Sequence, residues 1–185
     1  MSFKSKSIAL NACLISLAVL ISTPVMAKKP SERITVVDLA VFANSEEGPF
    51  PGVFDTLIDL VSDDEIVLNK LSGNGKYTVF APTDDAFGNL MTALGANCIV
   101  PTSDDIRSIL LYHVVRGNRD AASVIGSDQL RTLNGAFFNQ SGGMIMDVAG
   151  QTANIIVTDV FADNGVIHAI DTVLIPFEVP NLCTP

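Results

Sequence analysis

Two histidines, His113 and His168, are the side chains in this sequence best suited to proton transfer near neutral pH. Catalysis by either would need a partner, such as a hydroxyl or thiol nucleophile that the imidazole activates. The sequence contains no Gly-x-Ser-x-Gly elbow and no His-Glu-x-x-His motif. His113 follows Tyr112 among aliphatic residues, and His168 alternates with Ile167 and Ala169. We therefore predict two structural histidines, one at a helix–strand junction and one at a sheet margin, in a protein that is not an enzyme.

Carboxylates are the other candidates for chemistry, as ligands of a cation. A Ca²⁺ loop needs oxygen ligands at alternating positions. The segment from Asp159 to Asn164 breaks that alternation, because Val160, Phe161 and Ala162 stand inside it. The remaining acidic residues are dispersed in pairs and short runs, which is typical of a solvated surface. No metal site and no cofactor are predicted.

The first 27 residues have the organisation of a secretory signal. Lys4 and Lys6 precede an apolar stretch over residues 8–21, and Val25-Met26-Ala27 supplies small residues at a cleavage site. The apolar stretch is shorter than the roughly 20 residues that a spanning helix needs. We expect cleavage after Ala27 and export to the periplasm or the extracellular space, with an uncleaved membrane anchor as the alternative.

Cleavage leaves residues 28–185, a length of 158 that suits one domain. Residues 28–33 are predicted to be a flexible leader, and residues 34–185 a single domain with a short C-terminal tail. The loss of two lysines changes the net charge from −9 to −11, and no basic run remains. Nucleic acids and anionic membranes are therefore poor partners. We expect a monomer.

The cysteine count points to a disulfide. Cys13 leaves with the signal, so Cys98 and Cys183 remain as an even pair in an exported chain. A bridge between them would close a loop of 86 residues and hold the C-terminal tail. Two free thiols are the alternative.

Apolar periodicity and capping residues predict the elements that position these side chains. Helices are expected in the first half of the chain, where apolar residues recur at helical spacing and Thr83 and Ser103 precede acidic first turns; they cover residues 34–43, 53–61, 66–71, 83–95 and 103–112. Strands are expected at residues 76–81 and 113–116 and, after Gly126, in the remainder of the chain: 129–133, 136–140, 144–148, 154–161 and 166–175. The sequence Asp163-Asn164-Gly165 predicts a hairpin turn. This order predicts an α+β fold.

Three segments in this order resemble the fasciclin domain family. They are Tyr-Thr-Val-Phe-Ala-Pro-Thr-Asp-Asp-Ala-Phe at 77–87, Leu-Leu-Tyr-His-Val-Val at 110–115 and Asn-Gly-Val-Ile-His-Ala-Ile-Asp at 164–171. They correspond to the first conserved box, the Tyr-His motif and the second conserved box, and the resemblance covers residues 34–176. It implies a wedge of two small antiparallel or mixed β-sheets, a β-sandwich, with several helices packed on one end.

The resemblance also implies where partners bind. Fasciclin domains are associated with adhesion in secreted and cell-surface proteins, and the adhesive elements transfer to two segments. The partner-binding residues expected here are Leu110, Leu111, Tyr112, His113, Val114, Asp159 and Val160. Val160 stands where the family's element has isoleucine, and the Cys98–Cys183 pair is not part of the family pattern. The lone domain and short signal fit a bacterial exported protein.

Three functions follow as hypotheses. The first is a non-enzymatic module for cell adhesion or extracellular interaction, with a protein, polysaccharide or cell-surface component as partner. The second is a carrier of an apolar small molecule, carotenoid-like or lipid-like. The resemblance implies it, because some fasciclin-domain proteins are associated with carotenoid-like ligands, and the mean hydropathy of +0.41 agrees with it. Phe137-Phe138 and residues 144–146 could line its groove. The third is a hydrolase that uses His113 or His168.

Overall fold

The computed structural model describes residues 33–96 and 100–177. The helices in these ranges are α1 (Val36–Asn44), α2 (Asp55–Asp63), α3 (Glu65–Leu71), α4 (Asp84–Ala96), α5 (Ser103–Tyr112) and α6 (Ala121–Ile125). The strands are β1 (Tyr77–Pro82), β2 (Val114–Arg116), β3 (Gln129–Arg131), β4 (Phe137–Ser141), β5 (Met144–Met146), β6 (Thr152–Ala162) and β7 (Gly165–Ile170). The predicted signal peptide, most of the leader, and both cysteines of the predicted disulfide lie outside these ranges.

Side-chain caps define the starts of several helices. Thr35 and Asp38 form a capping box on α1, and Thr102 and Asp105 form one on α5. In α5 the cap is therefore Thr102 and not Ser103, because only Thr102 lies one residue before the first helical position. Each box satisfies amide groups that the first turn of a helix leaves without partners.

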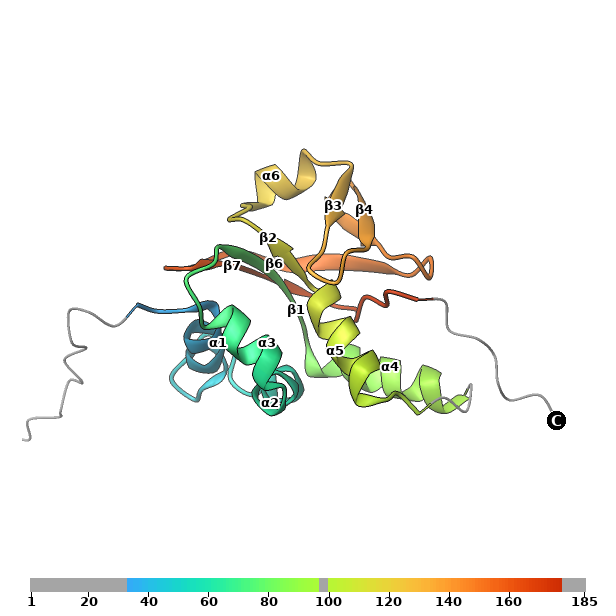
Figure 1. The fold of residues 1–185 in the computed structure, drawn as a ribbon, viewed down its shortest axis with the longest axis horizontal. Helices are drawn as coiled ribbons and strands as arrows, with labels where there is room; N and C mark the ends of the chain where they lie inside the picture. Colours follow the sequence, from blue (N-terminus) through green and yellow to red (C-terminus); the bar gives the residue numbers. More distant parts are fainter. Residues whose placement is uncertain (1–32, 97–99, 178–185) are drawn as a thin grey trace, which may run out of the picture. The chain divides into compact units, whose positions relative to one another are not determined.

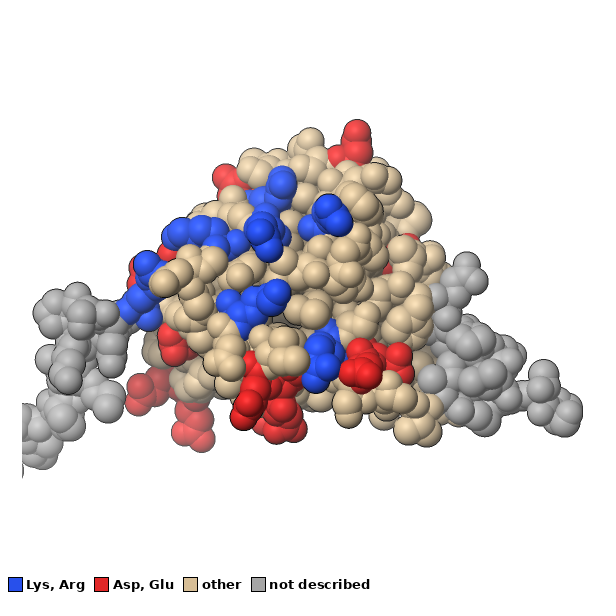
Figure 2. Space-filling view, viewed as in Figure 1, with Lys and Arg blue, Asp and Glu red and all other residues tan. Residues whose placement is uncertain are grey.

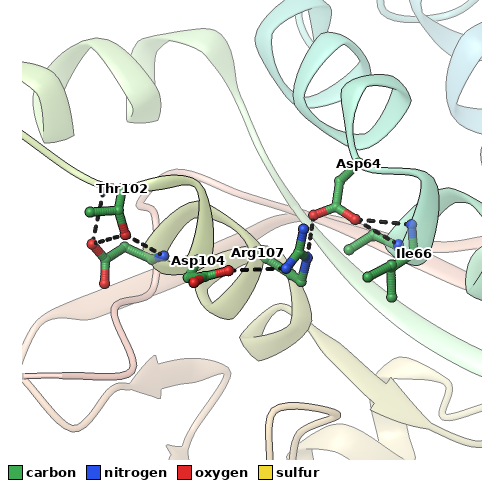
Figure 3. Close-up of polar contacts among 7 residues, drawn as sticks. Asp64, Ile66, Thr102, Asp104 and Arg107 are labelled. Atoms are coloured by element: carbon green, nitrogen blue, oxygen red, sulfur yellow. Dashed lines mark hydrogen bonds and ion pairs between the residues drawn. The ribbon is translucent and has the colours of Figure 1, made fainter.

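Asp64 both starts a helix and joins it to another (Figure 3). Its Oδ1 accepts from the amides of Ile66 and Val67 at the start of α3, and its Oδ2 accepts from Arg107 Nε of α5 at 2.6 Å. Arg107 also contacts Asp104. Partial burial by itself would raise the pKa of Asp64, but the amide and guanidinium donors together outweigh it and lower this pKa. One carboxylate thus connects α3 to the helix that carries the Tyr-His motif.

The strands form one mixed sheet of seven, in the order β2-β1-β7-β6-β5-β4-β3. Neighbours are antiparallel except β1 and β7, which are parallel from Tyr77↔Gly165 to Pro82↔Ile170. The outer strands β2 and β3 approach each other through a bridge between Val115 and Thr132, so the sheet curls almost into a barrel. The α+β class is confirmed. The predicted division into two small sheets is not confirmed, since the long strand β6 pairs with both β5 and β7.

The helices and the curled sheet enclose two groups of buried apolar residues. The first lies between helices α1–α5 and strands β1 and β7, and it includes Val67, Leu110 and Ile167. The second lies within the curl of the sheet, around Phe80 and Phe138, whose rings meet edge to face. Figure 1 shows α1–α5 below the sheet and α6 beside β2 and β3.

The structure corrects several predicted boundaries. Helix α6 was not predicted, and β7 ends at Ile170 rather than at residue 175. Asp120 begins α6 by accepting from the Ser123 amide, a short local signal without an apolar stripe long enough to be noticed. The segment 173–175 is buried although it is not a strand, because buried side chains of other elements provide its hydrogen bonds.

Candidate partner-binding site

Tyr112 of the Tyr-His motif stands at the end of α5 and points into the curled sheet. Its side chain is fully buried, its ring packs edge-on against Phe138, and its hydroxyl donates to the Phe137 carbonyl at 2.9 Å. Burial, with the negative charge of Asp147 nearby, raises the pKa of Tyr112 to about 12. Tyr112 therefore connects α5 to β4 and presents no surface to a partner in this fold.

His113 follows at the junction between α5 and β2 and is also buried. Its Nδ1 lies 2.8 Å from the Ile109 carbonyl oxygen, and its Nε2 accepts from the Leu174 amide at 2.9 Å. Because a carbonyl can only accept and an amide can only donate, the proton is on Nδ1. Burial lowers the pKa of His113 to about 4. The neutral ring therefore ties the end of α5 to the buried segment that follows β7.

The aliphatic residues around this pair are buried to different extents. Leu110 and Val114 belong to the core between the helices and the sheet, whereas Leu111 is half-buried. Among residues 110–115, Leu111 alone offers side-chain surface to solvent. The motif mainly holds α5 against β1 and β2.

Asp159 and Val160 lie at an irregularity of β6, where the pairing with β7 shifts register. Asp159 has a φ of 61°, a left-handed conformation that aspartate and asparagine tolerate better than most residues. Its Oδ1 accepts from the Ala121 amide at 2.8 Å, at the start of α6. Val160 pairs with Ile167 of β7. Both side chains are half-buried, so each keeps some surface for a contact.

His168 connects Asp159 to the loop before α6. Its Nδ1 accepts from the Asp159 amide at 3.2 Å, and its Nε2 donates to the Arg119 carbonyl at 2.9 Å. His168 is fully buried on β7, a central strand, rather than at a sheet margin as predicted. Its satisfied hydrogen bonds agree with the predicted structural role.

The two predicted adhesive elements do not meet. His113 and Val114 precede or begin β2, and Asp159 lies on β6, three strand positions away in the sheet order. At about 4.8 Å between neighbouring strands, this is roughly 14 Å along the sheet. A partner that contacted both would have to span β1 and β7.

Neither histidine has the partners that acid–base catalysis needs, because all four ring nitrogens are engaged with backbone groups. Across residues 33–96 and 100–177, no group of three or more His, Cys, Asp or Glu side chains is arranged to hold a metal ion. Within the same ranges, no helix is both long and apolar enough to cross a bilayer.

The sequence profile of the fasciclin domain matches residues 52–176. The chain belongs to the fasciclin domain family. It is 40% identical over 126 residues to protein sll1483 of Synechocystis sp.. The aligned region covers 66% of this chain and 67% of that protein. It is 38% identical over 104 residues to the immunogenic protein MPB70 of Mycobacterium bovis, 56% of this chain and 51% of MPB70.

A solved structure shows the same fold. A FAS1 domain pair from the insect cell adhesion molecule fasciclin I aligns with a TM-score of 0.52 at 22% identity, over 66% of this chain and 45% of that one. The chain thus spans about half the length of MPB70 and of the insect pair.

Two buried polar residues of this fasciclin domain were not recognised as connectors in the sequence. Asn164, in the second conserved box, accepts from the Val36 amide at 2.7 Å and donates to the Leu71 carbonyl at 2.6 Å. Asp147 accepts from the amides of Gln151 and Ile175, both at 2.8 Å, and burial raises its pKa. The Asn164-Gly165 pair predicted only a turn, and no sequence pattern marked Asp147. The connecting roles of Asn164 and Asp147 could not be predicted, because the segments that they join are distant in the chain.

Proposed function

We propose that this chain is an exported, non-enzymatic module for cell adhesion or extracellular interaction. The observation that carries the proposal is its membership of the fasciclin domain family, which includes an insect cell adhesion molecule. The hydrogen bonding of both histidines supports a role without catalysis. The partner is an extracellular protein, a polysaccharide or another cell-surface component.

The partly exposed residues of the two adhesive elements provide the partner contacts in this proposal. These residues are Leu111, Asp159 and Val160, which are half-buried. Leu110, Tyr112, His113 and Val114 act indirectly, because they are buried and position α5 and β2. Of the exposed atoms, the Asp159 carboxylate is the group that could bind a cation or a basic side chain.

Asp159→Asn tests this assignment with little disturbance of the fold. Asparagine keeps an oxygen for the Ala121 amide and tolerates the left-handed backbone, while the charge is removed. Loss of one charged hydrogen bond, about 1.5 kcal/mol, should weaken attachment about ten-fold. The measurement is the retention of intact bacterial cells on surfaces coated with the purified chain, with the melting temperature as a check of folding.

Asp59→Asn is the matched control, because Asp59 is an exposed carboxylate on α2. It removes the same charge away from the proposed contact and should leave attachment unchanged. Equal attachment by the Asp159 variant and the unaltered chain would contradict the site. Equal losses in both variants would mean that net charge, and not this site, governs attachment.

The carrier of an apolar molecule is the second candidate. An apolar cavity lies between α1–α3 and β1, and its lining includes Val37, Ile58 and Val79. Its volume is about 50 Å³, whereas pockets for drug-sized ligands hold roughly 300–1,000 Å³. The predicted groove residues do not form one surface either: Phe138 and Ile145 are buried, and Phe137, Met144 and Met146 are half-exposed on the other face of the sheet. A carotenoid-like ligand would therefore require the elements that line this cavity to move apart.

Native mass spectrometry of the chain, exported and purified without denaturant, separates the two candidates. A bare monomer supports the interaction module. Additional non-covalent mass that disappears on denaturation would favour the carrier and identify the class of ligand.

A further inference from the structure

Three arginines line one cleft above the place where β2 and β3 meet. Arg116 ends β2, Arg131 ends β3, and Arg119 lies in the loop before α6. The cleft has a volume of about 510 Å³, within the roughly 300–1,000 Å³ of small-molecule sites. Its other lining residues are Val115, Thr132, Leu133 and Gly135. The bridge between Val115 and Thr132 forms its floor and brings together arginines that are far apart in the sequence.

These arginines have no carboxylate partners within the part of the chain that the structure describes. Its ion pairs there are those of Arg107 with Asp64 and Asp104. Arg119 Nε is buried and has no hydrogen-bond partner. A buried donor without a partner is unfavourable, and a bound anion would satisfy it. The three guanidinium groups therefore form a positive cleft that the protein itself does not neutralise.

The surrounding surface makes this cleft distinctive. The whole chain has a net charge of −9. Figure 2 shows Lys and Arg side chains gathered over the part of the face that holds β2 and β3 in Figure 1, with Asp and Glu mainly along the helical edge below. Long polyanions are repelled by the acidic remainder. A short anionic ligand, or the end of a chain, would meet mainly the positive part of the face.

We propose that this cleft binds an acidic saccharide through its carboxylate groups. Guanidinium groups bind carboxylates with paired, charge-assisted hydrogen bonds. Leu133, which is half-buried, offers an apolar contact to the C–H face of a sugar ring. Beside the cleft, Arg131 lies over the half-exposed ring of Phe137, with 5.9 Å between the guanidinium carbon and the ring centroid. A site for inorganic phosphate alone would need neither this volume nor these apolar walls.

This proposal names a partner class for the interaction module and in that sense rests on the proposed function. Its test is separate, because it measures binding by the purified chain and not attachment of cells. Failure of the unaltered chain to bind the saccharide, together with normal attachment of cells, would contradict the saccharide site and leave the proposed function standing. Equal attachment by the Asp159 variant and the unaltered chain would contradict the Asp159 site and leave the saccharide site standing.

The experiment is calorimetric titration of the full chain with trigalacturonic acid at low salt, with neutral trigalactose as the matched sugar. The combined variant Arg116→Gln and Arg131→Gln should weaken binding of trigalacturonic acid by at least about ten-fold. Lys70→Gln, which removes a charge from the exposed α3 residue Lys70, should leave it unchanged. Raising the salt from about 20 to about 200 mM should weaken binding as well, because the site is partly exposed.

The proposal would be overturned by equal binding of the combined variant, by an equal loss in Lys70→Gln, or by neutral trigalactose binding as tightly as the acid. Inorganic phosphate that displaces the trisaccharide at the same concentration would make the cleft a general oxyanion site and contradict the saccharide assignment. If the combined variant does not fold, Arg131→Lys keeps the charge but loses the planar fork. It should still weaken binding, and unchanged binding would count against the proposed geometry.

Discussion

At the scale of single residues, the polar side chains of the conserved segments join backbone groups from distant parts of the chain. His113 links α5 to the segment after β7, His168 links β6 to the loop before α6, and Asn164 links α1 to the end of α3. Each side chain is buried, so each hydrogen bond lost would leave a polar group without water. Substitution of these side chains should therefore lower the free energy of unfolding.

His113 should make stability depend on pH. Its pKa is about 4 in the folded protein and about 6.5 when unfolded. Between these values the unfolded chain binds the proton and the folded chain does not, so the free energy of unfolding falls as the pH decreases from about 6.5 to about 4. The loss should be on the order of 3 kcal/mol at most. Urea denaturation across this range measures it.

The matched variant for this prediction is His113→Gln, which does not titrate. Carboxylates such as Asp64 and Asp171 have lowered pKa values and also lose stability in acid, so the informative quantity is the difference between the two proteins. We expect the variant to be less stable at pH 7, with the difference narrowing toward pH 4. A difference that is constant with pH would contradict the burial of a neutral imidazole.

Asn164→Ala should destabilise the fold by about 2–4 kcal/mol, because buried groups at Val36 and Leu71 would lose their partner. Asn89→Ala, at an exposed position of α4, is the control and should change stability little. Denaturant midpoints compare the two variants. A small effect of Asn164→Ala would mean that water enters and replaces the amide.

At the scale of elements, the parallel pairing of β1 with β7 restricts which residue types can occupy the position where the turn enters β7. Gly165 pairs with Tyr77, and a Cβ atom at this position would overlap the Tyr77 carbonyl oxygen and approach Val36. The glycine is thus required by the closeness of two backbones and not only by the hairpin turn. The turn and the parallel pair depend on the same residue.

Gly165→Ala should therefore destabilise the protein by about 3 kcal/mol through overpacking. Gly88→Ala is a sharp control, because Gly88 lies within α4 with no atom near the position of an added Cβ. Alanine there should stabilise the protein by about 0.5–1 kcal/mol. Thermal unfolding of both variants gives the opposite signs predicted. A shift of the same sign in both would contradict the close approach at Gly165.

At the scale of the whole molecule, the predicted Cys98–Cys183 bridge would connect two segments outside the described residues. Intact-mass measurement of the exported chain should find it lighter by the mass of two hydrogens than the reduced chain. Reduction should lower the free energy of unfolding by up to about 4–5 kcal/mol in the chain-entropy account. The double variant Cys98→Ser with Cys183→Ser cannot form the bridge and should match the stability of the reduced chain. Two thiols that react freely with alkylating agents in the folded protein would contradict the bridge.

The sequence alone determined the local structure of this protein. The cap at Thr83, the apolar stripes of α1–α5 and the turn at Asn164-Gly165 depend on residues a few positions apart, and such interactions can be predicted from the chain order. The three conserved segments also identified the family. The family match and the α+β fold confirm those two predictions.

Only the tertiary structure decided which side chains of the conserved segments are exposed and which face the core. Tyr112 and His113 at a helix–strand junction could point either way until α5 packed on the curled sheet. The strand order of the seven-stranded sheet is likewise a tertiary feature. The cleft lined by Arg116, Arg119 and Arg131 exists because β2 and β3 approach each other at the bridge between Val115 and Thr132. Strand partners and burial are non-local, because they are set by packing against segments whose position the local pattern does not encode.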